Sequence, residues 1–271
     1  IANNISSFCD SVSLYSMIGS KLDNINFIKK NLEKNVKFKY IEKKNSPTII
    51  KKKFIDLISN NKLFGVYEIE DENLNEKDEN KLNNLLSKNL SKFDLIVLSD
   101  YGHGFITEKI AKKICNKSRF LVLNSQLNAA NYGHHNIKKF NKSNCIIINE
   151  SELRHELRDK SQKLETLIPK MAKNLKAKFM VVTRGSEGVL LYDKYLKKFT
   201  SCPAFANNIV DKIGAGDSLM SLLAPLLKIN LDKEVLLFLS SLAGAQSVES
   251  MGNSKKIDKT QILKSAQYIL K

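Results

Sequence analysis

The sequence has no long apolar run, no cluster of cysteines and little arginine, and each of these absences excludes a class of protein. No window of its 271 residues approaches 18 consecutive apolar residues, and residues 1–10 lack a basic segment followed by an apolar one. Neither a membrane-spanning helix nor a signal peptide is therefore expected. The four cysteines lie far apart, which argues against a disulfide framework and against a zinc site. We predict a cytoplasmic protein with reduced thiols and no membrane partner.

The scarcity of arginine bears on the basic charge of the chain. Lys and Arg total 44 against 28 acidic residues, a net charge of +16, but only four of the 44 are arginine. Arginine is the side chain that most often reads bases and binds phosphates with two hydrogen bonds. The lysines are spread along the whole chain, and Lys and Asn together make up 68 residues. This pattern favours a solvated lysine surface over a nucleic-acid partner, with attraction of anionic substrates as a weaker alternative.

Short apolar runs that alternate with amphipathic stretches predict the fold. Four runs read as strands buried on both faces, and they lie at 94–100, 120–125, 145–150 and 179–184. Helical patterns separate them, a hairpin follows at 188–201, and further helices are expected at 216–227, 231–249 and 258–270. We predict a doubly wound, mostly parallel α/β sheet flanked by helices.

Residues 35–70 have a different pattern, in which apolar and polar residues alternate. This predicts a small antiparallel meander of three strands with one polar face. We expect residues 1–271 to form a single domain, with the strands of 35–70 inserted near its N-terminus. The chain begins with Ile1 rather than Met, in the middle of a pattern, which indicates a piece of a longer protein.

The clearest chemical signal is the segment 211–218, which leads directly into an apolar helix. Gly214, Ala215 and Gly216 would direct backbone N–H groups outward at the helix N-terminus and form an anion hole. Asp217, on the first turn, would take a proton from a hydroxyl group while these N–H groups hold a phosphoryl group. A glycine loop followed by an aspartate that caps the helix explains the same residues equally well.

Three other segments follow predicted strands, where ligands bind in sheets of this class. Residues 183–188 form a glycine-rich turn that suits phosphates but also an ordinary turn. Asn149 and Glu152 are spaced to reach hydrated Mg²⁺, or to cap a helix. Residues 99–104 form a loop rich in Asp and Gly. The order of these segments within one parallel-sheet domain makes coincidence a poor explanation.

These segments resemble the ribokinase-like (PfkB) family of sugar kinases. The residues 214–217 carry the most specific match, and the pattern from Asn149 to Glu152 and the turn at 183–188 agree with it. Residues 2–8, 46–53 and 98–104 match further family segments. Within the family, the kinase domains of bifunctional heptose 7-phosphate kinases, which are fused to an adenylyltransferase, are the most similar. The glycine pair that binds the sugar in this family would lie before Ile1.

The resemblance implies roles for particular residues. For catalysis and ATP binding these are Asp217 as general base, Gly214, Ala215 and Gly216 as anion hole, and Thr183, Arg184, Gly185, Gly188 and Asn149 around ATP. For metals they are Glu152 at Mg²⁺ through water, and Asp211 with the turn at Gly252 near a monovalent cation, expected to be K⁺. For the substrate they are Lys51 and Lys53 on a mobile lid, Asp100 and Asn124. The resemblance also implies a homodimer formed through the lid strands and a fused or partnered nucleotidyltransferase domain.

These roles predict an ATP-dependent kinase of heptose 7-phosphate that acts on the anomeric oxygen in nucleotide-sugar synthesis. One alternative is another specificity of the same family, such as fructose 6-phosphate, ribose or a nucleoside. Another is a weakly catalytic module that binds nucleotide and supports a fused transferase. The segment 124–126 reads Asn-Ser-Gln where heptose kinases have Asp-Pro-Lys, so a carboxylate and an ammonium group are replaced by neutral amides.

Overall fold

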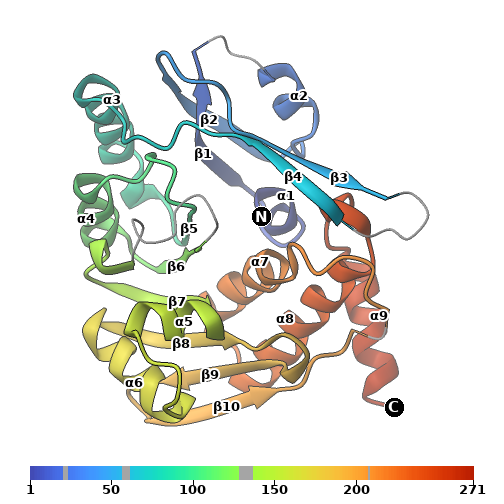
Figure 1. Ribbon diagram of the computed structural model, residues 1–271. Helices are drawn as coiled ribbons and strands as arrows, with labels where there is room; N and C mark the ends of the chain where they lie inside the picture. Colours follow the sequence, from blue (N-terminus) through green and yellow to red (C-terminus); the bar gives the residue numbers. More distant parts are fainter. Residues whose placement is uncertain (21–23, 57–61, 128–136, 207) are drawn as a thin grey trace.

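The structure is a computed structural model that describes the chain except residues 21–23, 57–61, 128–136 and 207 (Figure 1). The strands are β1 (Val12–Gly19), β2 (Val36–Lys43), β3 (Ile50–Ile55), β4 (Lys62–Glu68), β5 (Ile96–Asp100), β6 (Leu121–Ser125), β7 (Ser143–Asn149), β8 (Ala177–Thr183), β9 (Val189–Asp193) and β10 (Lys198–Cys202). The α-helices are α1 (Ala2–Ser6), α2 (Ile25–Lys30), α3 (Glu76–Ser87), α4 (Glu108–Lys117), α5 (Glu150–Leu157), α6 (Leu164–Asn174), α7 (Ala215–Lys228), α8 (Lys233–Val248) and α9 (Lys259–Ile269).

The main sheet has six strands in the order β10-β9-β8-β7-β6-β5. β5 to β8 are parallel, whereas β9 pairs with β8 and β10 pairs with β9 in antiparallel fashion. The predicted α/β class, with a mostly parallel sheet, is therefore confirmed. The four apolar runs and the hairpin lie at their predicted places within a few residues.

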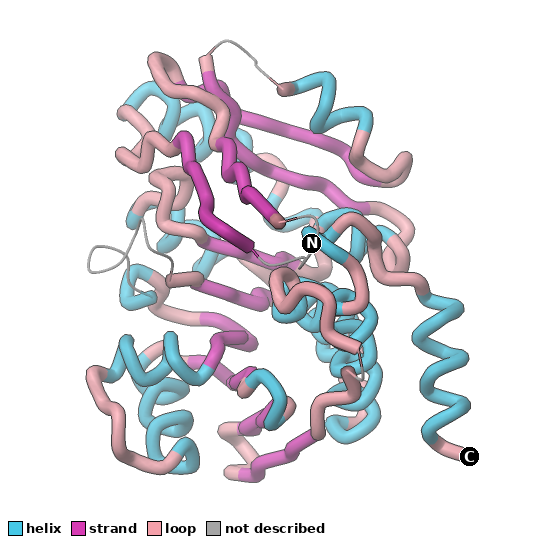
Figure 2. The backbone as a smooth tube through the Cα atoms, turned by 45° about the vertical axis from the view of Figure 1, so that its right-hand side comes forward, coloured by secondary structure: helices cyan, strands magenta, loops and turns pink. Residues whose placement is uncertain are grey.

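Helices cover both faces of this sheet because successive side chains of each strand point to opposite sides. On β7, Ile146 and Ile148 pack in a core with α3, α4, α5 and α6, while Cys145 and Ile147 pack in a second core with α7 and α8. Figures 1 and 2 show these helical layers on the two sides of the strands. In the described part of the chain, no helix is both long and apolar enough to cross a membrane.

The meander predicted over 35–70 is only partly present. β3 and β4 form an antiparallel hairpin, but β2 pairs in parallel with β1, a strand that the sequence analysis did not predict. The alternating pattern indicates that a segment is a strand, but it does not specify the partner. Between β1 and β2, α2 supplies the crossover that a parallel pair needs. We also expect a turn at residues 59–62 between the last two strands of the meander, and its residues 59–61 lie outside the described residues.

The register of the parallel strands aligns the residues at their carboxyl ends. Asp100 at the end of β5 lies opposite Ser125 at the end of β6, and Asn149 at the end of β7 lies opposite Thr183 at the end of β8. Polar residues from segments far apart in the sequence therefore meet at one edge of the sheet.

One glycine in the turn between β8 and β9 supports a prediction about stability. Gly188 has φ 84° and ψ −138°, and a Cβ atom there would lie 2.1 Å from the carbonyl oxygen of Cys202. Gly188→Ala should therefore lower the free energy of unfolding in urea by about 3 kcal/mol, from backbone strain and overlap together. Gly185→Ala is the matched control because its φ is 59° and a Cβ atom would contact nothing within 4 Å. It should cost about 1 kcal/mol, and equal losses would contradict this account.

Candidate functional site

Asp217 lies in the first turn of α7 but does not cap that helix. The N-cap is Gly214, with φ 89° and no side-chain hydrogen bond. The Asp217 carboxylate instead accepts a hydrogen bond of 3.1 Å from the Gln126 amide and a long one of 3.5 Å from the Tyr101 hydroxyl. Tyr101 follows β5 and Gln126 follows β6, so the carboxylate lies at the carboxyl edge of the sheet. The helix-cap interpretation of Asp217 does not describe this geometry.

The electrostatic surroundings suit Asp217 to accept a proton. Burial raises the pKa of its carboxyl group, and the hydrogen bonds from Tyr101 and Gln126 oppose that shift. Burial, reinforced by the charge of Asp217, also raises the pKa of Tyr101 to about 12, so the phenol remains a hydrogen-bond donor. A carboxylate with a raised pKa accepts a proton more readily than an exposed one.

The start of α7 is where the sequence predicts an anion hole. Gly214 takes a left-handed conformation that favours glycine, and among the described residues no side-chain hydrogen bond caps the first turn of α7. A Cβ atom on Gly216 would meet nothing within 4 Å, so the backbone there is open to a ligand. Free N–H groups and the helix dipole both favour a negative group at this position.

Asn149 and Glu152 form a complete capping box at the start of α5. The Asn149 side chain accepts from the Glu152 N–H at 2.8 Å, and a Glu152 oxygen accepts from the Asn149 N–H at 3.0 Å. The other Glu152 oxygen accepts from the N–H of Leu127 at 3.1 Å, next to Gln126. The helix-cap interpretation therefore describes this pair, and the same carboxylate also anchors the segment after β6.

The capping box bears on how a magnesium ion would be held. Glu152 is buried, which raises the pKa of its carboxyl group. Each of its oxygens keeps a second lone pair for a water molecule. Among the described residues, no group of three or more His, Cys, Asp or Glu side chains is placed to hold a metal ion. Mg²⁺ bound here would therefore rely on ligand phosphates and water, its usual arrangement.

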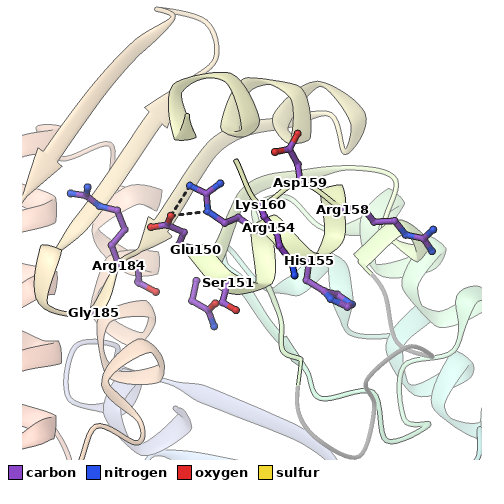
Figure 3. A pocket seen from close by; sticks show the side chains of 11 residues that line it. Glu150, Ser151, Arg154, His155, Arg158, Asp159, Lys160, Arg184 and Gly185 are labelled. Atoms are coloured by element: carbon purple, nitrogen blue, oxygen red, sulfur yellow. Dashed lines mark hydrogen bonds and ion pairs between the residues drawn. The ribbon is translucent and has the colours of Figure 1, made fainter. Parts of the chain in front are cut away.

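Four of the predicted ATP residues line one cavity of about 840 Å³ (Figure 3). These are Asn149, Thr183, Arg184 and Gly185. Gly188 does not line it, but its carbonyl accepts from the Arg184 N–H at 2.8 Å and closes the turn. The structure therefore brings the ends of β7 and β8 together around a concave surface.

Asp211 and Gly252 also meet, although 41 positions separate them. The Gly252 N–H donates to one Asp211 oxygen at 3.0 Å, and the Ile213 N–H donates to the other at 3.0 Å. The two segments that the resemblance assigns to a monovalent cation are therefore adjacent in the structure.

The predicted substrate residues Asp100 and Asn124 have partners within the protein. The buried Asp100 carboxylate forms an ion pair of 2.6 Å with Lys139 and accepts from the Gly102 N–H at 3.1 Å. The Asn124 amide donates to the carbonyl of Ile147 at 2.9 Å. These contacts hold the strand ends in place. Lys139 was not singled out in the sequence, because 39 positions separate it from Asp100.

The hairpin β3–β4 directs Lys51 toward the site. Lys51 Nζ lies 5.6 Å from the ring centre of Tyr101, whose hydroxyl contacts Asp217, and 5.9 Å from that of Tyr67. Burial lowers the pKa of Lys51. Lys53 is two residues on and shares its face of the hairpin, whereas Lys52 lies on the opposite face. Lys51 and Lys52 are both exposed, so the face and not the exposure distinguishes them.

Solved structures with a similar fold include ribokinase-like sugar kinases. Phosphofructokinase-2 from Escherichia coli in complex with potassium has a TM-score of 0.79 and 15% identity, covering 100% of this chain and 86% of that one. Ribokinase from Thermotoga maritima has a TM-score of 0.72 and 20% identity, covering 98% and 84%. These similarities establish the ribokinase-like fold.

Sequence comparison establishes the family. The sequence pattern of the pfkB family carbohydrate kinases matches residues 1–260, so the chain belongs to that family. As a member, it is a phosphotransferase with a sugar alcohol group as acceptor. Proteins named bifunctional protein HldE are similar: that of Nitratiruptor sp. is 25% identical over 82% of this chain and 46% of its own length. The HldE protein of Campylobacter jejuni strain RM1221 is 26% identical over 88% of this chain and 50% of its own length. The chain thus spans about half the length of these relatives.

Gln126 supports a prediction about the Asp217 carboxyl group. Because the Gln126 amide favours the charged carboxylate, Gln126→Leu should raise the pKa of Asp217 further. A carboxyl ¹³C NMR titration measures this directly. Tyr101→Phe removes the other hydrogen bond to this carboxylate and should shift the titration in the same direction. A lower pKa in the Gln126 variant would show that this contact does not stabilise the carboxylate.

Proposed function

We propose that this chain transfers a phosphoryl group from ATP to a phosphorylated sugar, with heptose 7-phosphate as substrate and its anomeric hydroxyl as acceptor. One observation carries the catalytic part: Asp217 lies partly buried beside a helix N-terminus without a side-chain cap, and strand-end donors rather than its own helix hold its carboxylate. The similarity to HldE proteins supports the heptose. Their bifunctional character supports a nucleotidyltransferase domain joined to or partnered with this kinase.

In the proposed reaction, Asp217 accepts the proton of the attacking hydroxyl group. The N–H groups at Gly214, Ala215 and Gly216 stabilise the negative charge on the phosphoryl group during transfer. Asn149 and the turn after β8 would line the ATP phosphates. Mg²⁺, held through water by Glu152, would neutralise phosphate charge when bound.

Lys51 is suited to bind the phosphate that the sugar already carries. Its ammonium group lies over Tyr101, next to the proposed base, on the face of the hairpin that also bears Lys53. A cation on a lid contributes binding energy to a phosphorylated sugar that an unphosphorylated sugar lacks. This placement favours a sugar phosphate over ribose or a nucleoside.

A second candidate is fructose 6-phosphate, which also carries a phosphate. The fold similarity to phosphofructokinase-2 is compatible with it. The neutral segment Asn124-Ser125-Gln126, which departs from the heptose kinases, favours this alternative or another sugar phosphate. Turnover measured in parallel on heptose 7-phosphate and fructose 6-phosphate separates the candidates.

The outer face of the hairpin is compatible with a homodimer. Phe54 and Phe64 stack with ring centres 4.4 Å apart, and both are exposed together with Val66. A second copy of the same face would cover these side chains. The proposal also includes a K⁺ ion near Asp211. It further includes a cytoplasmic location, which suits the four free cysteines.

Replacing the proposed base tests the reaction. Asp217→Asn should lower turnover by roughly 10²- to 10⁴-fold because the amide cannot accept the proton, while ATP affinity should change little. Coupled measurement of ADP release with Mg²⁺, K⁺ and ATP gives turnover, and calorimetry gives the affinity. Unchanged turnover would contradict the role of Asp217, and a parallel loss of ATP affinity would indicate a structural one.

The lid lysines allow a matched comparison. Lys51→Met should raise the KM for the sugar phosphate about tenfold with little change in kcat, because it removes a charge-assisted contact made before and during transfer. Lys52→Met removes the same charge from the opposite face of the hairpin and should leave KM near the wild-type value. Equal effects of both substitutions would attribute the contribution to the general field of the +16 chain.

A further inference from the structure

The backbone on both sides of the Gln126 side chain is held by other segments of the fold. The N–H of Gln126 donates to the carbonyl of Asp100 at 2.9 Å, and the N–H of Leu127 donates to a carboxylate oxygen of Glu152 at 3.1 Å. With these contacts made, the Gln126 amide nitrogen lies 3.1 Å from an oxygen of Asp217. The position of this amide therefore depends on two contacts that its own side chain does not make.

The contact with Glu152 lies just beyond the end of the sheet. The last paired residues of β6 are Asn124 on the side of β7 and Ser125 on the side of β5. Leu127 lies two residues past Ser125, outside the strand. Ordering the backbone there, and a long side chain beside it, costs conformational entropy. The hydrogen bond to Glu152 offsets part of that cost where the strand ladder has ended.

The Glu152 carboxylate is itself fixed in position. It is buried on the first turn of α5, and its second oxygen accepts from the N–H of Asn149 at 3.0 Å. The next residue, Leu153, is fully buried in the core on that face of the sheet. The carboxylate cannot rotate without breaking one of two hydrogen bonds, and a buried charge that loses a hydrogen bond is costly. The segment after β6 is thus tied to the start of α5.

We propose that Glu152 is a positioning residue for the base: through the backbone of Leu127, it holds the Gln126 amide against the carboxylate of Asp217. The inference rests on the proposed role of Asp217 and adds to Glu152 a function that requires no metal. It is compatible with a water-mediated contact to Mg²⁺, since each Glu152 oxygen keeps a second lone pair. The effect passes through one backbone hydrogen bond and one side chain, so the two carboxylates need not touch.

Position and charge predict opposite effects of Glu152 on Asp217. A second carboxylate acting through space disfavours a negative Asp217, so removing the Glu152 charge alone would lower the pKa of Asp217. Removing the contact with Leu127 releases Gln126, whose hydrogen bond favours the charged form of Asp217, and would raise that pKa. The direction of the change therefore separates the two explanations.

A carboxyl ¹³C NMR titration of Asp217 in the whole chain, without Mg²⁺ or nucleotide, tests the proposal. Glu152→Ala removes both acceptor oxygens and should raise the pKa of Asp217, as Gln126→Leu does. Glu152→Asp keeps the charge but is one methylene group too short to reach Leu127, so it should shift the titration in the same direction. Glu152→Ala combined with Gln126→Leu should produce no further rise beyond that of Gln126→Leu alone, because the amide that Glu152 positions is already absent.

Glu156 provides the matched control. It lies one turn further along α5, burial likewise raises the pKa of its carboxyl group, and it accepts a backbone hydrogen bond of 2.9 Å from Ile137. It also adds a like charge near Glu152. Glu156→Ala should leave the titration of Asp217 as it is in the wild type. Tyr101, which donates to Asp217, and Lys51, which lies over the Tyr101 ring, are unchanged in all of these variants.

A rise in the pKa of Asp217 that is confined to the Glu152 variants supports the proposal. An unchanged or lower pKa in Glu152→Ala, an equal rise in Glu156→Ala, or a further rise of full size in the Gln126→Leu background would overturn it. If circular dichroism shows that Glu152→Ala is unfolded, Glu152→Asp decides by the same criteria. The titration requires no turnover, whereas the role of Asp217 as base is measured by ADP release with Asp217→Asn, so either proposal can fail without the other.

Discussion

The parallel register of β5 to β8 is the constraint on which the site depends. These strands are buried on both faces, so their polar residues are confined to the ends, and the register aligns those ends at one edge. Residues that span more than eighty positions in sequence meet there: Asp100, Ser125, Asn149 and Thr183. α7 begins near the same edge and adds Asp217. A shift of one strand would separate these groups.

Burial explains why the carboxylates at this edge have specific partners, since a buried charge without a hydrogen bond is costly. Asp100 pairs with Lys139, and Glu152 accepts two backbone N–H groups. Asp217 differs from both, because its donors, Tyr101 and Gln126, come from segments that would also border a substrate. Its carboxylate is thus stabilised enough to remain in place and buried enough to have a raised pKa.

Charge in this chain is informative through its position rather than its total. Lys51 and Lys52 are adjacent in sequence, but the pleat of β3 directs Lys51 toward Tyr101 and Lys52 away from it. The position of the arginines is also specific, since three of the four line one cavity whereas the lysines are spread along the chain. Electrostatic attraction of anions by the whole chain and binding of anions at particular sites are therefore separable properties.

The sequence by itself determined the α/β class, the strands of the main sheet and the glycine-rich start of α7, because periodicity and glycine placement are local properties. It did not determine that β2 pairs with β1, that Gln126 binds Asp217, or that Lys139 pairs with Asp100. From the sequence, a functional role and a helix cap explained Asp217 equally well, and the same held for Asn149 with Glu152. In the structure, Asn149 and Glu152 cap α5, whereas Asp217 does not cap α7. Strand partners and long-range hydrogen bonds depend on packing between distant segments, and only the tertiary structure decides them.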